Sequence, residues 1–384
     1  MTTIFEQPSP WQRVRHVLTD FDATLLATMA VLGAIGLVAM YSAGHDHGTR
    51  FVDHARNMAI ALAVTFVVAQ VPPHKMERLA VPLYALGVAL LVAVALFGIT
   101  RKGATRWLNV GVVIQPSEIM KIAMPLMLAW WFQKREGQLR AADFLVAAAL
   151  LALPVGLVAR QPDLGTAILI LAAGLYVIFF AGLSWRIVVP VAVLAGAAVI
   201  ALVVGQDRLC SEGVRWPVLR EYQQHRVCTL LDPARDPLGK GFHILQGLIA
   251  IGSGGIGGKG FMQGTQTHLE FIPERTTDFI FAAYSEEFGF VGVAVLLVAL
   301  SVLILRGLAI AADAPTVFSR LLAGAVTMGF FTYAFVNMGM VSGILPVVGV
   351  PLPFVSYGGT AMVMLGLGLG ILMSVARSRQ LMRS

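Results

Sequence analysis

The sequence predicts an all-α, polytopic membrane protein with about ten transmembrane helices. Both termini are expected in the cytoplasm, with one large extracytoplasmic loop between helices 7 and 8. Hydrophobic residues make up 57% of the 384 residues and charged residues only 13%, whereas a soluble domain carries about 25% charged residues. Apolar segments of about twenty residues recur along the chain, and that length crosses the hydrocarbon of a bilayer.

These segments divide a single membrane domain, 1–384. A polar lead, 1–21, precedes seven apolar segments within 22–205, and a polar stretch, 206–278, separates them from three more within 279–376 and a tail, 377–384. The predicted spans are 22–42, 51–70, 79–98, 117–133, 142–159, 164–181, 186–205, 279–305, 318–341 and 357–376.

Basic residues in the short loops set the orientation, because Lys and Arg are retained in the cytoplasm. An even number of helices then places the stretch 206–278 outside, and the outside loop 342–356 carries no charge. The net charge of +7 is explained by cytoplasmic loops and by attraction to anionic lipid, and it does not indicate nucleic-acid binding. The expected cytoplasmic cations are Arg13, Arg15, Lys75, Arg78, Lys134, Arg135, Arg140, Arg186, Arg306, Arg320, Arg377, Arg379 and Arg383.

One outside loop, 100–111, breaks this charge pattern with Arg101, Lys102 and Arg106. Cations on the outer side indicate an anionic partner there. Long basic side chains also reach lipid phosphates from such positions, and the sequence leaves both interpretations open.

Several ionisable residues fall near or inside the predicted spans. Glu118 and Lys121 are three residues apart and share a helix face. Asp163 starts a span, and Glu286 with Glu287 lies about two turns into another. Charges at such depth are expensive and usually face a cavity or a partner. The alternatives are a structural ion pair for Glu118 and Lys121, a helix N-terminal carboxylate for Asp163, and an interfacial position for Glu287.

The outward stretch contains both cysteines, Cys210 and Cys228. On the oxidising side of the membrane they would form a disulfide worth about 3 kcal/mol, and the alternative is two unpaired thiols. The segment 251–261 matches G-x-G-x-x-G but lacks the strand and βαβ context of a dinucleotide site. Its glycines let backbone amides approach a phosphate, let the loop bend into the membrane, or simply make it flexible.

The last outside segment, 339–359, is apolar and interrupted by Pro346, Pro351 and Pro353, so it is not a continuous helix. Irregular apolar backbone beside a membrane must be buried in protein or line a cavity. We therefore expect either a groove wall for a lipid chain or a structural re-entrant cap.

The residues favour acid–base chemistry on an activated lipid. The sequence shows no Gly-x-Ser-x-Gly and no metal-spaced His and Cys cluster. An outward enzyme has no access to cytoplasmic nucleotide sugars, and a lipid pyrophosphate is already activated. One base for an incoming hydroxyl and cations for the departing phosphates would suffice. Asp278, where the polar stretch meets a span, is the candidate base.

The motifs QPSEIMK, QPDLGT, LDPARDPLGKGFHILQ, AIGSGGIGGKGF, PERTTDFIFA and LPVVGVPLPFVSYGG together resemble the SEDS family (shape, elongation, division and sporulation). The resemblance covers about 22–380 and is nearer to the rod-elongation branch than to the division branch. It implies a ten-helix, multi-pass enzyme of the bacterial cytoplasmic (inner) membrane. On the outer face, it would polymerise lipid II into β-1,4-linked peptidoglycan strands carried on undecaprenyl pyrophosphate.

The same resemblance implies partners and site residues. Family members work with a class B penicillin-binding protein, which crosslinks the new strand, and with other membrane proteins of the elongation machinery. The essential aspartate falls on Asp278, and the accompanying cavity residues fall on Glu118, Lys121 and Asp163. Two further cavity residues are weaker matches, at Arg56 and Arg106. Arg101, Lys102, Arg106 or Lys121 would stabilise pyrophosphate. A divalent cation, Mg or Mn, is compatible with this chemistry, but its ligands are unknown.

Two departures from the family pattern stand out. Thr276 replaces a histidine, so any assistance that this histidine gives Asp278 is absent or supplied elsewhere. The segment 208–219 looks like an insertion, which makes the possible disulfide specific to this branch. Two other function classes remain open: a flippase for a lipid-linked precursor, and a scaffold of the elongation machinery that would tolerate loss of Asp278.

Overall fold

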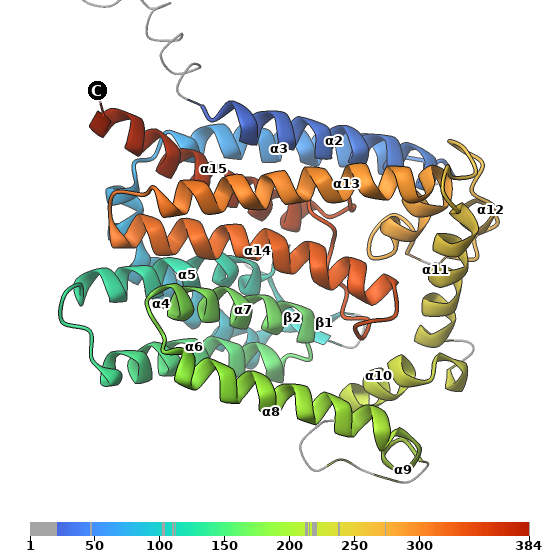
Figure 1. Ribbon diagram of the computed structural model, residues 1–384, viewed down its shortest axis with the longest axis horizontal. Helices are drawn as coiled ribbons and strands as arrows, with labels where there is room; N and C mark the ends of the chain where they lie inside the picture. Colours follow the sequence, from blue (N-terminus) through green and yellow to red (C-terminus); the bar gives the residue numbers. More distant parts are fainter. Residues whose placement is uncertain are drawn as a thin grey trace, which may run out of the picture.

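The computed structural model describes residues 21–46, 48–101, 104–109, 111, 113–211, 214, 216, 221–236, 239–272 and 274–383. Within these ranges it is a helical bundle whose long helices run side by side (Figure 1). Ten helices match the predicted spans. They are α2 (Ala23–Ala43), α3 (Arg50–Ala69), α4 (Pro73–Phe97), α5 (Pro116–Lys134), α6 (Ala141–Arg160), α7 (Leu164–Phe180), α8 (Trp185–Val204), α13 (Ile280–Ala312), α14 (Val317–Val341) and α15 (Gly359–Arg383).

Eight of these described helices are long and apolar enough to cross a membrane. The other two are α7, which has 17 residues, and α5, which carries an internal ion pair between Glu118 and Lys121. A short or charged helix is tolerated inside a bundle because neighbouring helices shield it from lipid.

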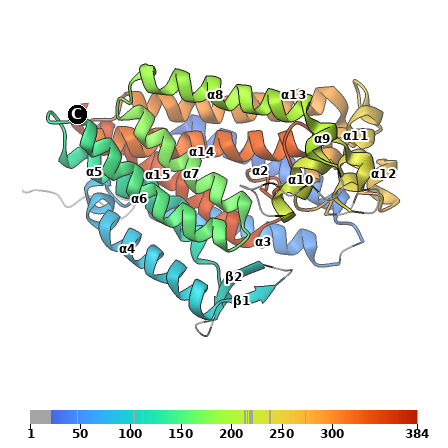
Figure 2. The ribbon, with the colours of Figure 1, turned by 90° about the horizontal axis from the view of Figure 1, so that it is seen from below.

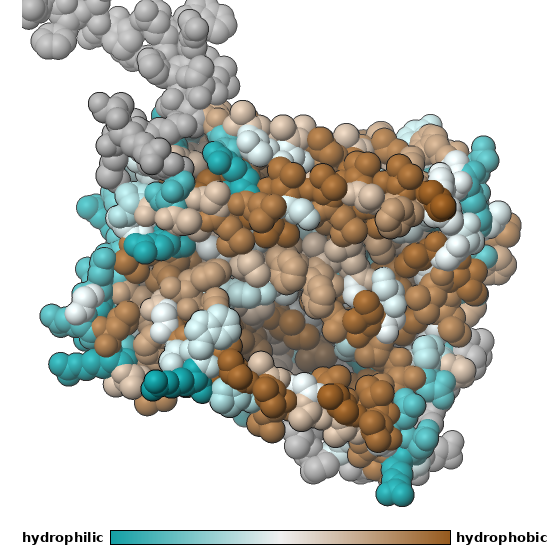
Figure 3. Space-filling view, in the orientation of Figure 1, coloured by the Kyte–Doolittle hydropathy of each residue, from teal (hydrophilic) through white to brown (hydrophobic). Residues whose placement is uncertain are grey.

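The arrangement agrees with the predicted topology. The start of α2 and the end of α15 lie at one end of the bundle, and α11 and α12 lie at the other (Figure 1). The space-filling surface is hydrophobic over a broad central zone and hydrophilic towards both ends (Figure 3). Positively charged loops assign the end with the termini to the cytoplasm.

The outward loop between α4 and α5 contains a small sheet, which was not predicted from the sequence. Strands β1 (Ile99–Arg101), β2 (Ala104–Asn109) and β3 (Val113–Ile114) pair in the order β1-β2-β3, antiparallel throughout. Thr100 and Thr105 join β1 to β2 through their hydroxyls at 2.7 Å, a stabilising cross-strand pair. The hairpin projects beyond the end of α4 (Figure 2) and orients Arg106.

The outward stretch expected as a loop also contains short helices. They are α9 (Gln206–Leu209), α10 (Glu221–Leu231), the 3-10 helix η1 (Pro233–Arg235), α11 (Lys240–Gly254) and α12 (Thr265–His268). Helix α11 packs against α13. The described part of this stretch is therefore a structured layer over the outward end of the bundle.

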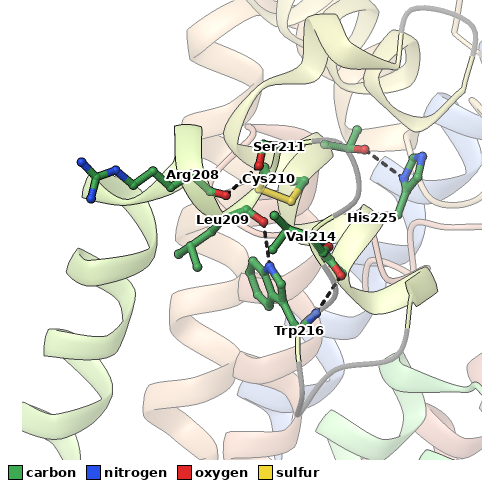
Figure 4. The surroundings of a disulfide bond; sticks show 10 residues. Arg208, Leu209, Cys210, Ser211, Val214, Trp216 and His225 are labelled. Atoms are coloured by element: carbon green, nitrogen blue, oxygen red, sulfur yellow. Dashed lines mark hydrogen bonds between the residues drawn. A yellow bond between two sulfur atoms is a disulfide. The ribbon is translucent and has the colours of Figure 1, made fainter.

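A disulfide joins Cys210 to Cys228, 18 residues apart in the sequence (Figure 4). It connects the segment after α9 to α10. The indole of Trp216 donates to the Leu209 carbonyl at 2.8 Å beside it. The disulfide and this bond together tie the outward end of α8 to the layer formed by α10.

Replacing both cysteines by serine is expected to loosen this connection by about 3 kcal/mol, because the unfolded loop regains its conformational entropy. Limited proteolysis of the wild type should cut within 206–236 faster after reduction. The double-serine variant should be cut quickly with and without reductant. Equal protection of the reduced and oxidised wild type would contradict this prediction.

The glycine-rich segment 251–261 completes a broken helix. Helix α13 is interrupted at Gly289, whose φ of 61° and ψ of −161° are non-helical and accessible almost only to glycine. The backbone groups released by the break pair with this segment. Lys259 N donates to Glu286 O at 3.0 Å and Phe290 N to Gly255 O at 2.9 Å. The glycines thus let two backbones approach closely, which supports the interpretation that the loop bends towards the membrane.

Helix α8 differs from the other spans. None of its residues, all of which the structure describes, is buried. It runs along the edge of the bundle in Figure 1. Its apolar side chains are left to lipid, and its outward end is held through the disulfide.

Candidate active site around Asp278

Asp278 lies in the turn immediately before α13 and is half-buried. The preceding turn begins at Glu274, whose carbonyl accepts from Thr277 N at 3.0 Å and from Phe279 N at 3.2 Å. Phe279 is 1% exposed and packs against the ring of His243 on α11. The carboxylate is therefore carried on a short, hydrogen-bonded turn at the outward end of the bundle.

Three consecutive backbone carbonyls fix this turn. Tyr357 N donates to Thr276 O at 2.9 Å, Ser356 Oγ to Thr277 O at 2.7 Å, and Asn337 Nδ2 to Asp278 O at 3.0 Å. The donors come from α14 and from the irregular segment that follows it. With its carbonyls held, the turn has little freedom to move the carboxylate.

The irregular segment after α14 is buried, as expected. Val347, Val350 and Leu352 are each at most 5% exposed. Gly349 has a φ of +75°, and a Cβ there would lie 3.2 Å from Asp278 Oδ2. The glycine therefore allows the backbone conformation of the irregular segment and leaves space for the Asp278 carboxylate.

The same segment connects Asp278 to Asp163. Next to Asp163, a Cβ on Gly165 would lie 2.7 Å from Val348 O, so α7 begins against this segment. Asp163 caps α7 by accepting from Thr166 N at 3.3 Å, and it also accepts from Gln115 Nε2 at 2.9 Å. Arg106 Nη1 lies 3.6 Å from Asp163 Oδ1, the oxygen that also accepts from Thr166 N. Asp163 is therefore a helix cap and also the partner of a cation from the β-hairpin.

Glu118 and Lys121 form a buried ion pair at 2.7 Å. Lys121 Nζ also donates to Tyr333 OH at 2.6 Å, and Glu118 Oε2 is buried without a hydrogen-bond partner. Tyr333 lies one turn before Asn337 on α14, on the same face. One face of α14 thus contacts both the Lys121 pair and the Asp278 turn. A cavity of about 50 Å³ lies beside Lys121 and Tyr333.

Two basic residues have other partners. Arg56 is 64% exposed and pairs with Asp53 at 3.0 Å on its own helix. Arg275 is buried and binds the Ala43 carbonyl at 2.9 Å, together with the Asp46 carboxylate. It anchors the turn to the end of α2. Lys102 and the side chain of Arg101 lie outside the described residues.

Glu286 and Glu287 are buried anchors of the glycine-rich segment. Glu286 accepts from Lys259 Nζ at 2.6 Å and from Gln266 N at 2.9 Å. Glu287 accepts from the Ser42 hydroxyl on α2. The interfacial interpretation of Glu287 is therefore wrong, because it is only 3% exposed and bonded to protein.

Four residues of the site were not predicted from the sequence: Arg50, Ser356, Tyr333 and Asn337. Asn337 could have been found, since an amide inside an apolar span is expensive unless it has partners. It is 0% exposed and also donates to Val350 O at 2.7 Å. Arg50 Nη1 donates to Thr276 Oγ1 at 3.2 Å, a contact between distant segments that no local pattern indicates.

The described residues do not form a metal site by themselves. No group of three or more His, Cys, Asp or Glu side chains within the described ranges converges to hold an ion. A divalent ion shared with a substrate pyrophosphate remains a proposal.

Replacing Asn337 by alanine is expected to lower kcat about tenfold with little change in KM. The turn then loses the donor that fixes the Asp278 carbonyl, and small misplacements of a catalytic group reduce rates strongly. Steady-state kinetics at unchanged folded fraction would measure this. In the Asp278→Asn background, Asn337→Ala should have almost no further effect, since both act through one group. Additive losses would contradict the positioning role.

Comparisons with known proteins identify the family of this chain. A model of the FtsW/RodA/SpoVE family, described as "Cell cycle protein", matches residues 22–381. "Peptidoglycan glycosyltransferase MrdB" of Escherichia coli (strain K12) is 48% identical over 93% of this chain and 94% of its own length. "Peptidoglycan glycosyltransferase RodA" of Treponema pallidum (strain Nichols) is 32% identical over 96% of this chain and 100% of its own.

Solved structures agree in fold. One, described as "Structural coordination of polymerization and crosslinking by a peptidoglycan synthase complex", superposes with a TM-score of 0.76 at 32% identity, covering 94% of this chain and 98% of that one. The crystal structure of RodA from Thermus thermophilus gives a TM-score of 0.67 at 28% identity, covering 94% and 97%.

Proposed function

The chain belongs to the FtsW/RodA/SpoVE family of cell cycle proteins, which is the SEDS family expected from its motifs, and we propose that it is a peptidoglycan glycosyltransferase with Asp278 as its general base. It is a multi-pass protein of the bacterial cytoplasmic membrane. Its relatives named for this activity span nearly its whole length. The observation that carries the role of Asp278 is a carboxylate on a turn at the outward end, whose three backbone carbonyls each accept a hydrogen bond.

The substrate is lipid II, and the reaction is a single displacement. Asp278 removes the proton of the acceptor sugar 4-hydroxyl, and the resulting oxygen attacks the anomeric carbon of the donor strand. The new C–O bond forms as the bond to pyrophosphate breaks, and undecaprenyl pyrophosphate leaves with the electron pair. An α-linked pyrophosphate gives a β-1,4 bond, so the configuration inverts. A positioned base contributes about 10²- to 10⁴-fold to such a rate.

The network beside Asp278 supports the binding of a charged substrate. The Lys121 ammonium is buried with Glu118 and Tyr333, and Arg106 reaches Asp163 from the β-hairpin. Burying charged groups inside a membrane bundle costs free energy, so such groups usually have a function. Lys121 and Arg106 are therefore candidates to exchange part of their carboxylate contact for a phosphate when substrate binds.

The partner is a class B penicillin-binding protein that crosslinks the strand as it emerges. A solved complex that coordinates polymerisation with crosslinking contains a chain with this fold, which supports the same pairing here. Other membrane proteins of the elongation machinery are expected beside it.

Polymerisation of labelled lipid II in liposomes tests the activity. The purified protein, with and without its crosslinking partner, should produce glycan chains separable by electrophoresis. A parallel assay should follow whether labelled lipid II becomes accessible on the opposite leaflet. Translocation without chains, with the partner present and divalent ion supplied, would favour a flippase instead. The absence of both polymerisation and translocation would favour a scaffold.

A further inference from the structure

Arg50 is a cation placed beside the Asp278 turn. It is the first residue of α3, at the outward end of the bundle, and is partly buried. One guanidinium nitrogen, Nη1, donates to Thr276 Oγ1 at 3.2 Å. The guanidinium also lies 4.8 Å from the centre of the Tyr357 ring, so stacking and a hydrogen bond fix its plane.

Among the described residues, no carboxylate balances the charge of Arg50. Within the described part of the chain, no carboxylate oxygen lies within 4.0 Å of its guanidinium. Five other cations at the outward end differ in this respect, because each has a carboxylate within that distance. These are Arg56 with Asp53, Arg106 with Asp163, Lys121 with Glu118, Lys259 with Glu286, and Arg275 with Asp46.

A cation held rigidly without a counter-charge is well suited to bind an anion. Arginine presents five N–H donors in a planar fork that fits phosphate oxygens, and only one atom, Nη1, is engaged with Thr276. A phosphate bound there would gain a full ionic partner without first displacing a carboxylate. At Lys121 or Arg106 the substrate must compete with an existing ion pair.

We propose that Arg50 binds the pyrophosphate of the lipid-linked substrate. The inference rests on the proposed function, which supplies the pyrophosphate. Thr276 and Asp278 lie two residues apart on one turn, and Tyr357 fixes that turn through Thr276 O while it stacks on Arg50. A single rigid unit thus presents a base for the acceptor and a cation for the leaving group, the two functions that the displacement requires.

The test compares Arg50→Gln with Thr276→Val. Loss of the phosphate contact should raise KM for lipid II about 10- to 100-fold in Arg50→Gln, because hydrogen bonds to charged groups contribute that much. Thr276→Val removes the hydroxyl but keeps the cation, so KM should change less than about threefold. Arg50→Lys should recover part of the affinity, since it restores the charge without the fork.

Arg208→Gln is the matched control. Arg208 is exposed on the same outward side and points away from the disulfide and its neighbours (Figure 4). The variant loses the same charge, so an unchanged KM would exclude a general electrostatic effect. An unchanged KM in Arg50→Gln, or an equal rise in Thr276→Val, would overturn the proposal. The second result would reduce Arg50 to a structural anchor of the turn.

Direct binding separates this inference from the proposed function. Undecaprenyl pyrophosphate and undecaprenyl monophosphate would be titrated against the purified full-length protein in detergent. The wild type should prefer the pyrophosphate, and Arg50→Gln should lose most of this preference. Retention of the full preference would refute the role of Arg50 even if polymerisation is observed. Conversely, loss of the preference would support it even if the polymerisation assay failed.

Discussion

Replacing Asp278 by asparagine is expected to lower polymerisation at least about 100-fold while lipid II still binds. An amide keeps the shape of the carboxylate but cannot take the proton of the acceptor hydroxyl, and a positioned base contributes about 10²- to 10⁴-fold. The backbone bonds that hold the turn involve the carbonyls of residues 276–278 and not this side chain. The fold and the affinity for lipid should therefore survive.

Glu274→Gln is the control for Asp278→Asn. Glu274 is an exposed carboxylate in the same turn, and the bonds that close the turn use its backbone carbonyl. The same chemical change there should alter kcat by less than about threefold. Chain synthesis by Asp278→Asn at the wild-type rate would remove Asp278 as the base and redirect attention to Asp163 and Glu118. Equal losses in both variants would indicate that the turn, and not the carboxylate, is what matters.

The second large effect is expected at Glu286. This carboxylate is 0% exposed and accepts five hydrogen bonds from the segment 259–267: Lys259 Nζ, Thr265 Oγ1, Gln266 N, Thr267 N and Thr267 Oγ1. Glu286→Ala would leave the Lys259 ammonium without its carboxylate and the backbone amides of Gln266 and Thr267 without their acceptor. Breaking a buried charge pair by removing one member costs about 3–5 kcal/mol.

Thermal unfolding in one detergent would measure the loss in Glu286→Ala. Glu270→Gln is the matched control, because Glu270 is 69% exposed and only 3.7 Å from Arg275. Because the Glu270 carboxylate is largely solvated, losing this contact should cost only about 0–1 kcal/mol. Glu286→Gln should fall between the two, since its amide oxygen still accepts some of the five bonds. A midpoint for Glu286→Ala within a degree of the wild type would show that the glycine-rich segment is held by other contacts.

The ten spans were predictable because each has its own signal. Length and hydropathy identify a spanning segment without reference to its neighbours, and the observed ends at Ala43 and Val341 fall within a residue of the prediction. Only α4, which starts earlier at Pro73, and α13 and α15, which continue to Ala312 and Arg383, depart much. Their extra turns are polar or lie past the membrane boundary, where hydropathy carries no information.

The candidate site was predictable only where charge lies in an apolar segment or at its boundary. Glu118, Lys121 and Asp163 were identified in this way, and the structure places each in a polar contact. Arg50 was not, because its significance depends on Thr276 and Tyr357, which are more than 200 residues away. In the sequence, Thr276 was notable only because it replaces the histidine of the family pattern. Its hydroxyl instead accepts from Arg50, a relationship that exists only once α3 and the turn are packed together.

The exposure of α8 has a consequence for sequence variation. A helix surrounded by lipid is constrained by partition free energy and not by shape, so exchanges among valine, leucine, isoleucine and alanine should be nearly neutral along Trp185–Val204. The buried faces of α14 allow no such freedom, since cores register the loss of a single methylene. Substitutions in α8 should therefore be accepted whenever the new residue is apolar. Substitutions at buried positions of the neighbouring helices should be accepted only when a contacting residue changes in compensation.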